Sequence, residues 1–361
     1  MMVPTNAAGR GGFSRYTPRV SSTDLPFVTT LSEPITGVIK DRPDDFVVEE
    51  IPAYTPSGEG EHLYVRFEKV GLDTEHAVKR IASALGVRDT PGWAGLKDRH
   101  ARTTQWASFQ RGDREAALAL SLEGIRVLEA GLHGNKLRTG HLRGNRFVLR
   151  LRGADASREA DARAVLEALS RSGVPAFFGE QRFGRGGATL TRGREWIVGS
   201  GRPPRAPFER KLQVSAVQSA VFNDLLVERI RTGGLASIVE GDLCRKEDTG
   251  GMFVATDLED ARARAERFEL SATGPMLGAE MRWPEGEARA LEEAAMARAG
   301  LDAEKLERFR RAGEGTRRPY RFRMSEPSVS SDADGLVLSF ILPAGAYATI
   351  VLRELTRDHA A

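Results

Sequence analysis

Cysteine is almost absent from this chain of 361 residues, since Cys244 is the only one. A single cysteine excludes a disulfide within the chain and any zinc site that needs several thiolates. The six histidines are scattered, and no pair of them has the H-x-x-x-H spacing of a helical metal site. We therefore expect a protein without a metal.

Long hydrophobic runs are also absent. No apolar stretch reaches the roughly 18–20 residues that a helix needs to cross a bilayer. The N-terminal segment contains Gly, Ser, Pro and Arg but lacks the apolar centre of a secretory signal. These absences predict a soluble, cytoplasmic protein that has no membrane partner.

Charge of one sign is not in large excess, because 53 Lys and Arg stand against 50 Asp and Glu, giving a net charge of +3. The basic residues are nevertheless clustered. The three clusters are Lys136, Arg138, Arg143, Arg146, Arg150 and Arg152; Arg182, Arg185, Arg192 and Arg194; and Arg317, Arg318, Arg321 and Arg323. Such clusters suit a polyanion, since each neutralised phosphate releases counterions, although solvated surfaces carry the same pattern.

Strands are predicted near both ends of the chain. Apolar and polar residues alternate over 62–68 and 145–152, and residues 46–51 and 336–342 are also typical of strands. In 145–152 one face carries Phe147 and other apolar residues, whereas the opposite face carries arginines. One face is therefore expected to pack inward while the other can meet phosphates.

Helices are predicted mainly in the middle of the chain. The periodicity of apolar residues predicts helices over 74–85, with Asp73 as N-cap, and over 158–171. Ser215 and Gln218 match a capping box that would open a further helix ending at 233–234. Residues 257–311 are rich in Ala, Glu and Arg and are predicted to be mostly helical, and a last helix follows a turn at 343–345.

A helical middle between strand-bearing ends indicates an insertion domain. The first 33 residues are rich in small, polar and helix-breaking types, which predicts a flexible N-terminal tail. Ordered structure is expected from about Ile35 onward.

Residues 92–101 place Lys97, Asp98 and Arg99 directly after a glycine and an apolar residue. Loops at sheet edges commonly carry catalytic groups. A carboxylate between two cations should have a lowered pKa, which favours an anionic nucleophile over a proton donor. The same spacing also suits a solvated turn with local ion pairs. His100 follows as a candidate general base or as an ordinary surface histidine.

A glycine-rich loop at 179–187 invites a phosphate-loop interpretation. It lacks the third glycine at dinucleotide spacing, and the chain has no G-x-x-x-x-G-K-[ST] segment. We therefore expect no nucleotide cofactor. Arg182 and Arg185 make the loop a candidate for contacting RNA, with a purely structural loop as the alternative.

Six segments, in order, resemble the TruD family of tRNA pseudouridine synthases. They are KxxPxDFVVxE at 40–50, GxGEH at 58–62, AGLKDRxAxTxQW at 94–106, KLRxGxLxGNxF at 136–147, FGxQRFG at 178–184 and LPAGxYATxxxREL at 342–355. The resemblance extends from Ile35 to Leu355. Six segments in register are far more specific than any one of them.

The resemblance implies roles for individual residues. Asp98 matches the catalytic aspartate and Lys40 the basic residue that pairs with it. The positions that match contacts to the target nucleotide are Phe46, Asn145 and Tyr347, together with Phe147, which matches the aromatic residue that stacks on the base. Tyr347 departs from the family, in which Phe is common. The arginines expected to hold the RNA are Arg143, Arg146, Arg182 and Arg185.

The resemblance also implies the fold. We expect an α+β protein with a discontinuous pseudouridine-synthase core, a mainly antiparallel sheet and a TruD-type insertion domain. The core is expected to comprise residues 34–171 and 319–357, and the insertion residues 172–318. A monomer is expected.

The implied activity is isomerisation of uridine to pseudouridine in tRNA, at position 13 of the D-arm. The base must be flipped out of the RNA, which costs a few kcal/mol, and an aromatic side chain can return about 1–3 kcal/mol by stacking. The reaction involves neither redox change nor phosphate transfer, so no cofactor is expected. The alternatives are a synthase that modifies another uridine or RNA, a non-catalytic RNA-binding protein of the same fold, and a metal-dependent nuclease. Retention of Asp98 and Lys40 argues against the second, and the lack of a nearby carboxylate–His cluster argues against the third.

Overall fold

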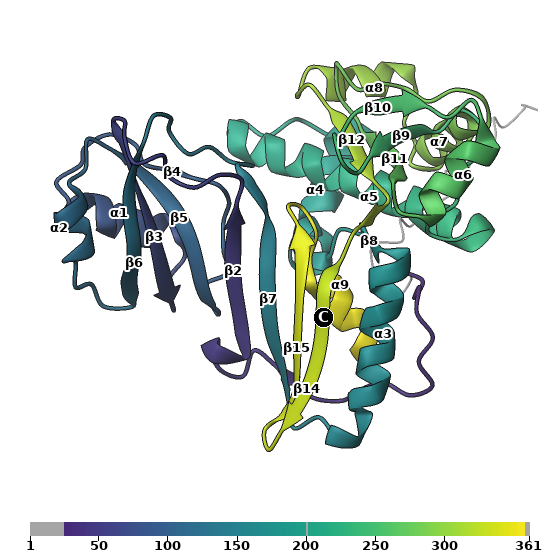
Figure 1. Cartoon of the computed structure of the whole chain (residues 1–361). Coiled ribbons are helices and arrows are strands. Elements are labelled where there is room, and N and C mark those ends of the chain that lie inside the picture. The colour runs from purple at the N-terminus through teal and green to yellow at the C-terminus, as the bar shows by residue number, and fades with distance from the viewer. Residues whose placement is uncertain (1–24, 200, 358–361) are drawn as a thin grey trace, which may run out of the picture.

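One large sheet runs through the lower part of the molecule in the computed structural model, which describes residues 25–199 and 201–357 (Figure 1). Its main path has the order β14-β15-β7-β2-β5-β3-β6, and β1 and β4 pair with β7 and β5 at the side. The strands are β1 Val38–Ile39, β2 Phe46–Pro52, β3 His62–Val70, β4 Gly92–Trp93, β5 Arg102–Gln110, β6 Ile125–His133, β7 Leu142–Arg152, β14 Ser325–Asp332 and β15 Gly335–Pro343.

Antiparallel pairing dominates this sheet. Among its described strands only β2 and β5 pair in parallel, and β7 lies between β2 and β15, which come from opposite ends of the chain. The predicted α+β class with a mainly antiparallel sheet is therefore confirmed. The sheet is discontinuous in sequence, because everything between β7 and β14 leaves it.

Helices bury the apolar faces of the sheet. Helices α1 (Thr74–Ala84) and α2 (Arg114–Leu118) pack with β3 and β5 around a core that contains Leu63, Phe67 and Phe109. Helix α3 (Glu159–Ser172) packs on β14 and on α9 (Ala348–Thr356). Asp73 accepts a hydrogen bond from the backbone N–H of His76 at 2.8 Å, so the predicted N-cap of α1 is confirmed.

A second body, drawn in green at the top of Figure 1, is built from the middle of the chain. Its four-stranded sheet has the order β10-β9-β11-β12. Its elements are α4 Ala188–Ile197, α5 Pro207–Gly233, β9 Leu243–Lys246, β10 Met252–Val254, α6 Leu258–Glu266, β11 Leu270–Met276, α7 Gly286–Arg298, α8 Ala303–Arg310 and β12 Thr316–Pro319. Short 3₁₀ turns at Pro43–Asp45, Ala156–Arg158, Glu180–Phe183 and Arg185–Gly187 complete the structure.

The chain enters and leaves this second body through one pair of short strands. Strand β8 (Val174–Pro175) leads out of the large sheet, and β13 (Arg321–Phe322) leads back, and the two pair with each other. A continuous apolar core extends from Leu149 and Leu338 of the large sheet to Phe222 and Ala272 of the second body. The predicted domain limits at 171/172 and 318/319 remain predictions; the strand pair lies within a few residues of them.

The predicted start of the long helix in the middle of the chain is wrong. Helix α5 begins at Pro207 and not at a capping box, because Pro suits the first turn of a helix and Ser215 lies in the interior, where its carbonyl accepts from the Ser219 hydroxyl. Residues 257–311 are mostly helical as predicted, since α6, α7 and α8 contain 30 of these 55 residues, but the prediction missed β11, a fully buried inner strand of the second sheet. Its Gly and Pro give it little strand propensity, so tertiary burial decides its structure.

The predicted flexible tail at 1–33 remains a prediction, because its residues 1–24 lie outside the described residues; its last part makes specific contacts. Leu25 is buried, and the backbone N–H groups of Val28 and Thr29 donate to the Glu354 carboxylate at 3.0–3.2 Å. The Arg353 guanidinium lies 3.9 Å from the centre of the Phe27 ring. Residues 25–29 are thus held against α9 by partners more than 300 residues away in sequence, which no local pattern could reveal.

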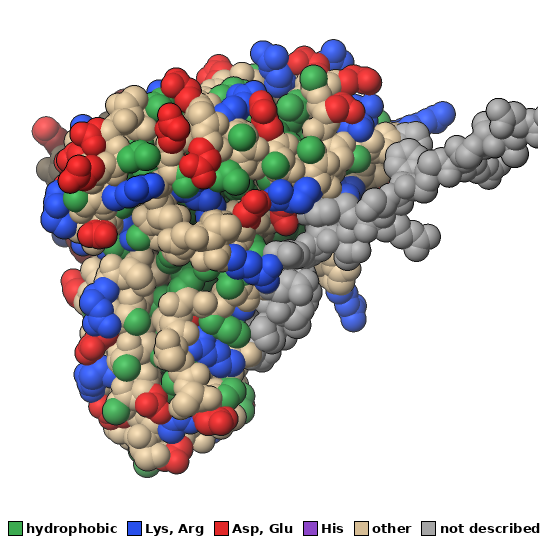
Figure 2. Space-filling model, turned by 90° about the vertical axis from the view of Figure 1, so that its right-hand side faces the viewer, with side chains coloured by type: hydrophobic (Ala, Val, Ile, Leu, Met, Phe, Trp, Pro, Cys, Tyr) green, Lys and Arg blue, Asp and Glu red, His purple; other side chains and the backbone are tan. Residues whose placement is uncertain are grey.

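Charge on the visible surface is mixed. In Figure 2, blue and red side chains are interspersed over both bodies, in keeping with the net charge of +3. Among the described helices, none combines the length and apolarity that crossing a bilayer requires.

Candidate active site

The loop between β4 and β5 brings Asp98 against Lys40, which comes from the segment just after β1. The Lys40 ammonium donates to the Asp98 carboxylate in a short ion pair, and both side chains remain partly exposed, at 29% and 38%. The other carboxylate oxygen accepts the backbone N–H of His100 at 3.0 Å. Lys40 itself has φ +59°, a left-handed conformation that is uncommon for a residue with a side chain and often marks functional sites.

Opposing effects set the pKa of Asp98. Burial raises it, whereas the hydrogen bonds from Lys40 and His100 lower it, and the net result lies below the ordinary aspartate value. The carboxylate is therefore ionised at neutral pH. Its expected flanking cations act elsewhere, because Lys97 donates to Glu50 at 2.7 Å and the Arg99 side chain donates to the carbonyl of Gly71 at 3.1 Å. The prediction of a low pKa is confirmed, but its stated cause is wrong.

The Lys97–Glu50 ion pair anchors the loop on the sheet. Its side chains are only 6% and 1% exposed, and the second Glu50 oxygen accepts the backbone N–H of Trp106 at 3.2 Å. The backbone N–H of Lys97 donates to the Thr74 hydroxyl at 2.8 Å. These buried bonds hold Lys97, the residue before Asp98, directly through β2 and α1, and Glu50 extends the network to β5.

Lys69, near the end of β3, is a functional candidate that sequence reasoning missed. It is fully buried, and its ammonium donates to the backbone carbonyls of Asp98 at 2.9 Å and Leu72 at 2.7 Å. Burial lowers its pKa to about 8. Lys69 continues the inward-facing positions of β3 set by Phe67, so the available signal was a lysine in the apolar phase of a strand.

Aromatic rings continue the site beyond Lys40. Its ammonium lies 4.2 Å from the centre of the Phe46 ring on β2, and this ring meets Phe147 on β7 edge to face at 6.4 Å. Phe147 also packs on Phe340 of β15 at 5.6 Å. The structure therefore brings together Asp98, Lys40, Phe46 and Phe147, as the resemblance implied.

Asn145 lies two residues before Phe147 on the same face of β7. Its side-chain oxygen is buried and has no hydrogen-bond partner among the described residues. Gly144 precedes it where β7 and β15 approach closely, and a Cβ there would lie 2.3 Å from the Leu342 carbonyl oxygen. A buried unpaired amide oxygen is costly, which is expected where a ligand supplies the missing donor.

Tyr347, at the start of α9, belongs to a different neighbourhood. It is 38% exposed, and its described ring contacts are with Phe178 at 6.3 Å and with the guanidinium of Arg318 at 5.9 Å. Among the described contacts, none joins it to Asp98, Lys40 or Phe147. Tyr347 also lines a cavity of about 480 Å³ together with Arg182, Leu212 and Gly179.

The arginines expected to hold RNA differ in their surroundings. Arg143 is exposed at the start of β7, whereas Arg146 pairs with Glu326 at 2.7 Å. Arg182 donates to the hydroxyl of Ser219 at 3.2 Å, and Arg185 is exposed. Among the described residues, no carboxylate lies within ion-pair distance of Arg143, Arg182 or Arg185.

The arginine face of β7 is largely neutralised within the sheet. Arg150 pairs with Asp332 at 2.5 Å and Arg152 with Asp45 at 2.6 Å. The hydrogen bond from Arg152 lowers the pKa of Asp45, which is buried. That this face can meet phosphates remains a prediction; Arg150 and Arg152 already have acidic partners from other segments, which are invisible in the local sequence.

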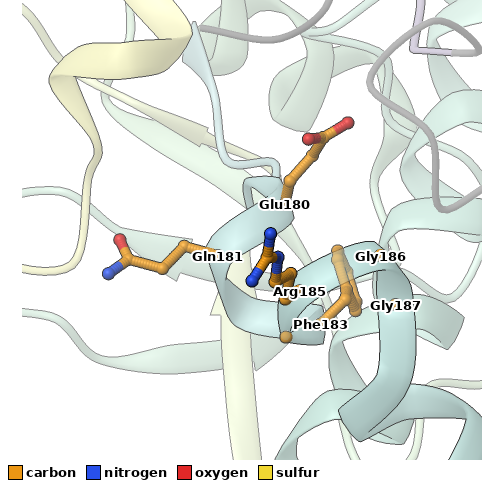
Figure 3. A pocket seen from close by; sticks show the side chains of 7 residues that line it. Glu180, Gln181, Phe183, Arg185, Gly186 and Gly187 are labelled. Carbon is orange, nitrogen blue, oxygen red and sulfur yellow. The ribbon is translucent and has the colours of Figure 1, made fainter.

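The glycine-rich loop encloses a cavity of about 650 Å³, lined by Glu180, Gln181, Phe183 and the residues 184–187. In Figure 3 the Glu180 and Gln181 side chains point away from each other, and Arg185 lies between them. No group of three or more His, Cys, Asp or Glu side chains suited to a metal occurs within the described part of the chain. The His100 side chain is exposed; its backbone N–H donates to the Asp98 carboxylate, and its charge also contributes to lowering the pKa of Asp98.

Comparison with known proteins identifies the family. The profile described as tRNA pseudouridine synthase D (TruD) matches residues 23–200 and 208–355. This chain belongs to the TruD family. The tRNA pseudouridine synthase D of Anaeromyxobacter dehalogenans strain 2CP-1 is 46% identical over 345 residues, covering 94% of this chain and 98% of the relative. That of Thermus thermophilus is 43% identical over 337 residues, covering 93% of each chain.

The TruD fold is confirmed by a solved structure. The crystal structure of a putative tRNA pseudouridine synthase D from Methanosarcina mazei superposes with a TM-score of 0.75 and covers 94% of this chain and 98% of its own, at 22% sequence identity. The resemblance found in six short segments therefore reflects a relationship over nearly the whole chain.

Proposed function

We propose that this TruD-family chain isomerises uridine to pseudouridine in tRNA, at position 13 of the D-arm, with Asp98 as the nucleophile. The observation that carries the proposal is the ion pair of Asp98 with Lys40, set against the rings of Phe46 and Phe147. The family match supports tRNA as the substrate. A lowered pKa supplies the anionic carboxylate that attack on a sugar carbon requires.

As the Asp98 carboxylate forms a bond to C1′, the bond from C1′ to N1 breaks and the uracil leaves with the electron pair. After the base turns, C5 attacks C1′ and the bond to Asp98 breaks; C5 then loses its proton and N1 gains one, so the product is an isomer of the substrate. We assign Asp98 to the attack at C1′, and Lys40 to keeping that carboxylate ionised and oriented. The target base is flipped out of the RNA to reach the carboxylate. Stacking on Phe147 then offsets part of the lost stacking in the RNA.

Asn145 suits a role in holding the uracil. Its unpaired side-chain oxygen can accept the imino N–H of the base, which removes the cost of a buried acceptor without a partner. Phe46 supports the Phe147 ring from the side. Tyr347 is assigned to the nucleotide from the α9 side of the site, where it is exposed enough to be reached.

The test compares Asp98→Asn with the wild type on a tRNA transcript that carries uridine at position 13. We expect pseudouridine formation to fall by roughly 10⁴-fold or more, as when other nucleophiles are removed, with tRNA affinity nearly unchanged. Asp89→Asn, at an exposed position, serves as the matched control. Substantial turnover by Asp98→Asn would refute its role as the nucleophile.

Mapping pseudouridine in total RNA with and without the protein tests the target. A signal at position 13 of tRNA supports the proposal, whereas a signal only at another uridine or in another RNA would favour a synthase of different specificity. The monomeric state and the cytoplasmic location remain predictions, the first of which size-exclusion chromatography tests directly.

A further inference from the structure

Arg318 lies at the junction of the two bodies, on β12 where the second body returns toward the large sheet. Its Nε and Nη2 donate to the backbone carbonyl of Ala176 at 3.1 and 3.0 Å. Nη2 also donates to the carbonyl of Gly345 at 3.1 Å, in the turn just before Tyr347. One guanidinium therefore ties together β12, the segment after β8 and the start of α9.

The charge of Arg318 has no counter-charge among the described residues. No carboxylate there lies within ion-pair distance, and aromatic rings surround the guanidinium instead. The distances from its central carbon to the ring centres are 4.2 Å for Phe178, 4.8 Å for Phe322, 5.6 Å for Phe222 and 5.9 Å for Tyr347. Burial lowers the pKa of Arg318 to about 10. A cation in such surroundings is stabilised by a bound anion.

The two buried arginines of this segment, Arg317 and Arg321, have a full set of partners that Arg318 lacks. Arg317 is paired with Glu292 at Nη1, at 3.0 Å. Each guanidinium nitrogen of Arg321 donates to a protein oxygen, among them the Ser172 carbonyl and the Ser271 hydroxyl. In contrast, Nη1 of Arg318 has no described partner and is not among the buried unpaired atoms, so it is open to a ligand.

A second cation stands beside Arg318. The guanidinium of Arg182 lies 5.2 Å from the same Phe178 ring, and its positive charge contributes to lowering the pKa of Arg318. Arg182 and Tyr347 both line the cavity of about 480 Å³. Glu180 lines it too, so its described lining holds one acid and one arginine, Arg182.

We propose that Arg318 and Arg182 bind a backbone phosphate of the RNA, at the junction of the two bodies. This inference rests on the proposed function, since it places the phosphate next to Tyr347 and therefore next to the target nucleotide. Arginine suits this role because its guanidinium can stack on aromatic rings while free N–H groups contact phosphate oxygens. The phosphate supplies the charge that Arg318 lacks and holds the RNA backbone while the base enters the site.

The experiment measures affinity for an unmodified tRNA transcript as a function of salt concentration. Each phosphate contact adds about 0.7–0.9 to the slope of log K against log salt. Arg318→Met should make this slope less steep by about that amount. Arg318→Lys, which keeps the charge, should leave the slope as steep as in the wild type. Arg171→Met, at an exposed position on α3, is the matched control and should leave the slope unchanged.

Arg182→Met gives a second test if Arg318→Met does not fold, as judged by circular dichroism. It too should lower the slope by about 0.7–0.9. If Arg318→Met folds and its slope is as steep as that of the wild type, the proposal is overturned. If Arg318→Met does not fold, the same result with Arg182→Met overturns it. Pseudouridine formation by the wild-type protein on the same transcript separates the outcomes: its absence refutes the proposed function, whereas an unchanged slope with an active wild type refutes only the phosphate site.

Discussion

Two lysines contact Asp98, one at its carboxylate and one at its backbone carbonyl. Lys40 contacts the side chain directly and is partly exposed, whereas Lys69 contacts the backbone carbonyl and is fully buried. Lys40 lowers the pKa of Asp98, and Lys69 adds a buried positive charge near it. The two residues are therefore expected to affect pH dependence in different ways.

Replacing Lys40 with Met should raise the pKa of Asp98, because burial then acts with less opposition. The acid limb of the profile of kcat against pH should move to higher pH, since protonated aspartate is not a nucleophile. Lys40→Arg, which keeps the ion pair, is the control and should move the limb less. An unchanged acid limb in Lys40→Met would mean that Lys40 does not set the ionisation of Asp98.

Lys69 should make stability depend on pH in the alkaline range. Its folded pKa of about 8 lies below the ordinary value of 10.5, so between these values the unfolded chain binds more protons than the folded one. The contribution of this group to the free energy of unfolding should therefore rise with pH across this window, and the full cost of its burial should remain below about pH 8. Urea unfolding of wild type and Lys69→Met at two pH values, one near neutrality and one in the upper part of this window, tests this. At the higher pH, the free energy of unfolding of the wild type should rise relative to that of Lys69→Met. The same difference in free energy of unfolding at both pH values would contradict the lowered pKa of Lys69.

At the scale of the secondary-structure element, β7 combines three tasks along one strand. Its inward face supplies Asn145 and Phe147 to the site, and its later arginines hold neighbouring strands through acids such as Asp45 and Asp332. Only its beginning, around Arg143, presents an arginine without a described acidic partner. The strand is thus structural at one end and available for RNA at the other.

Arg143 and Arg146 should therefore contribute unequally to tRNA binding. Arg143→Ala should lower the slope of log K against log salt by about 0.7–0.9. Arg146→Ala should lower it less, because the exposed pair with Glu326 already competes for its charge. Glu326→Ala is the informative control, since freeing Arg146 should strengthen binding. Equal slopes for the two alanine variants would show that the ion pair does not persist in the complex.

At the scale of the whole molecule, residues near the N-terminus pack against the last helix, α9. Residues 25–29 are bound by Arg353 and Glu354 of α9, and the Glu354 carboxylate is fully buried. The same helix begins at Tyr347, which contacts Arg318 from the second body. Helix α9 therefore connects the N-terminal segment, the large sheet and the second body.

Two N-terminal truncations should show whether residues 25–33 contribute to thermal stability. A variant that lacks residues 1–33 should have a lower Tm than one that lacks residues 1–24, because it loses the buried Leu25 and leaves the Glu354 carboxylate without its backbone donors. Thermal unfolding of both variants, followed by circular dichroism, provides the comparison. Equal Tm values would mean that residues 25–33 do not stabilise α9.

The sequence alone determined much of this protein. Local patterns located β2, β3, β7, β15 and α1, because alternation and capping are local properties, but they did not predict β5, β6 or β14 of the same sheet. The six segments identified the family and, through it, Asp98 and the residues expected around it. It could not place β11 or the start of α5, where burial and a single Pro outweigh the surrounding composition. The local sequence also pointed to Lys97 and Arg99 as the cause of the low pKa of Asp98, whereas the hydrogen bonds that lower it come from Lys40 and His100.

The resemblance implied that Asp98 pairs with Lys40, 58 positions earlier, but only the tertiary structure decided the other charge pairs. Lys97, for example, turns inward to Glu50 and away from Asp98. Arg318 lies among aromatic rings from separate elements, so its missing counter-charge has no local sequence signature. The physical reason is that ion pairing and burial act through space, and the packing of distant elements sets both.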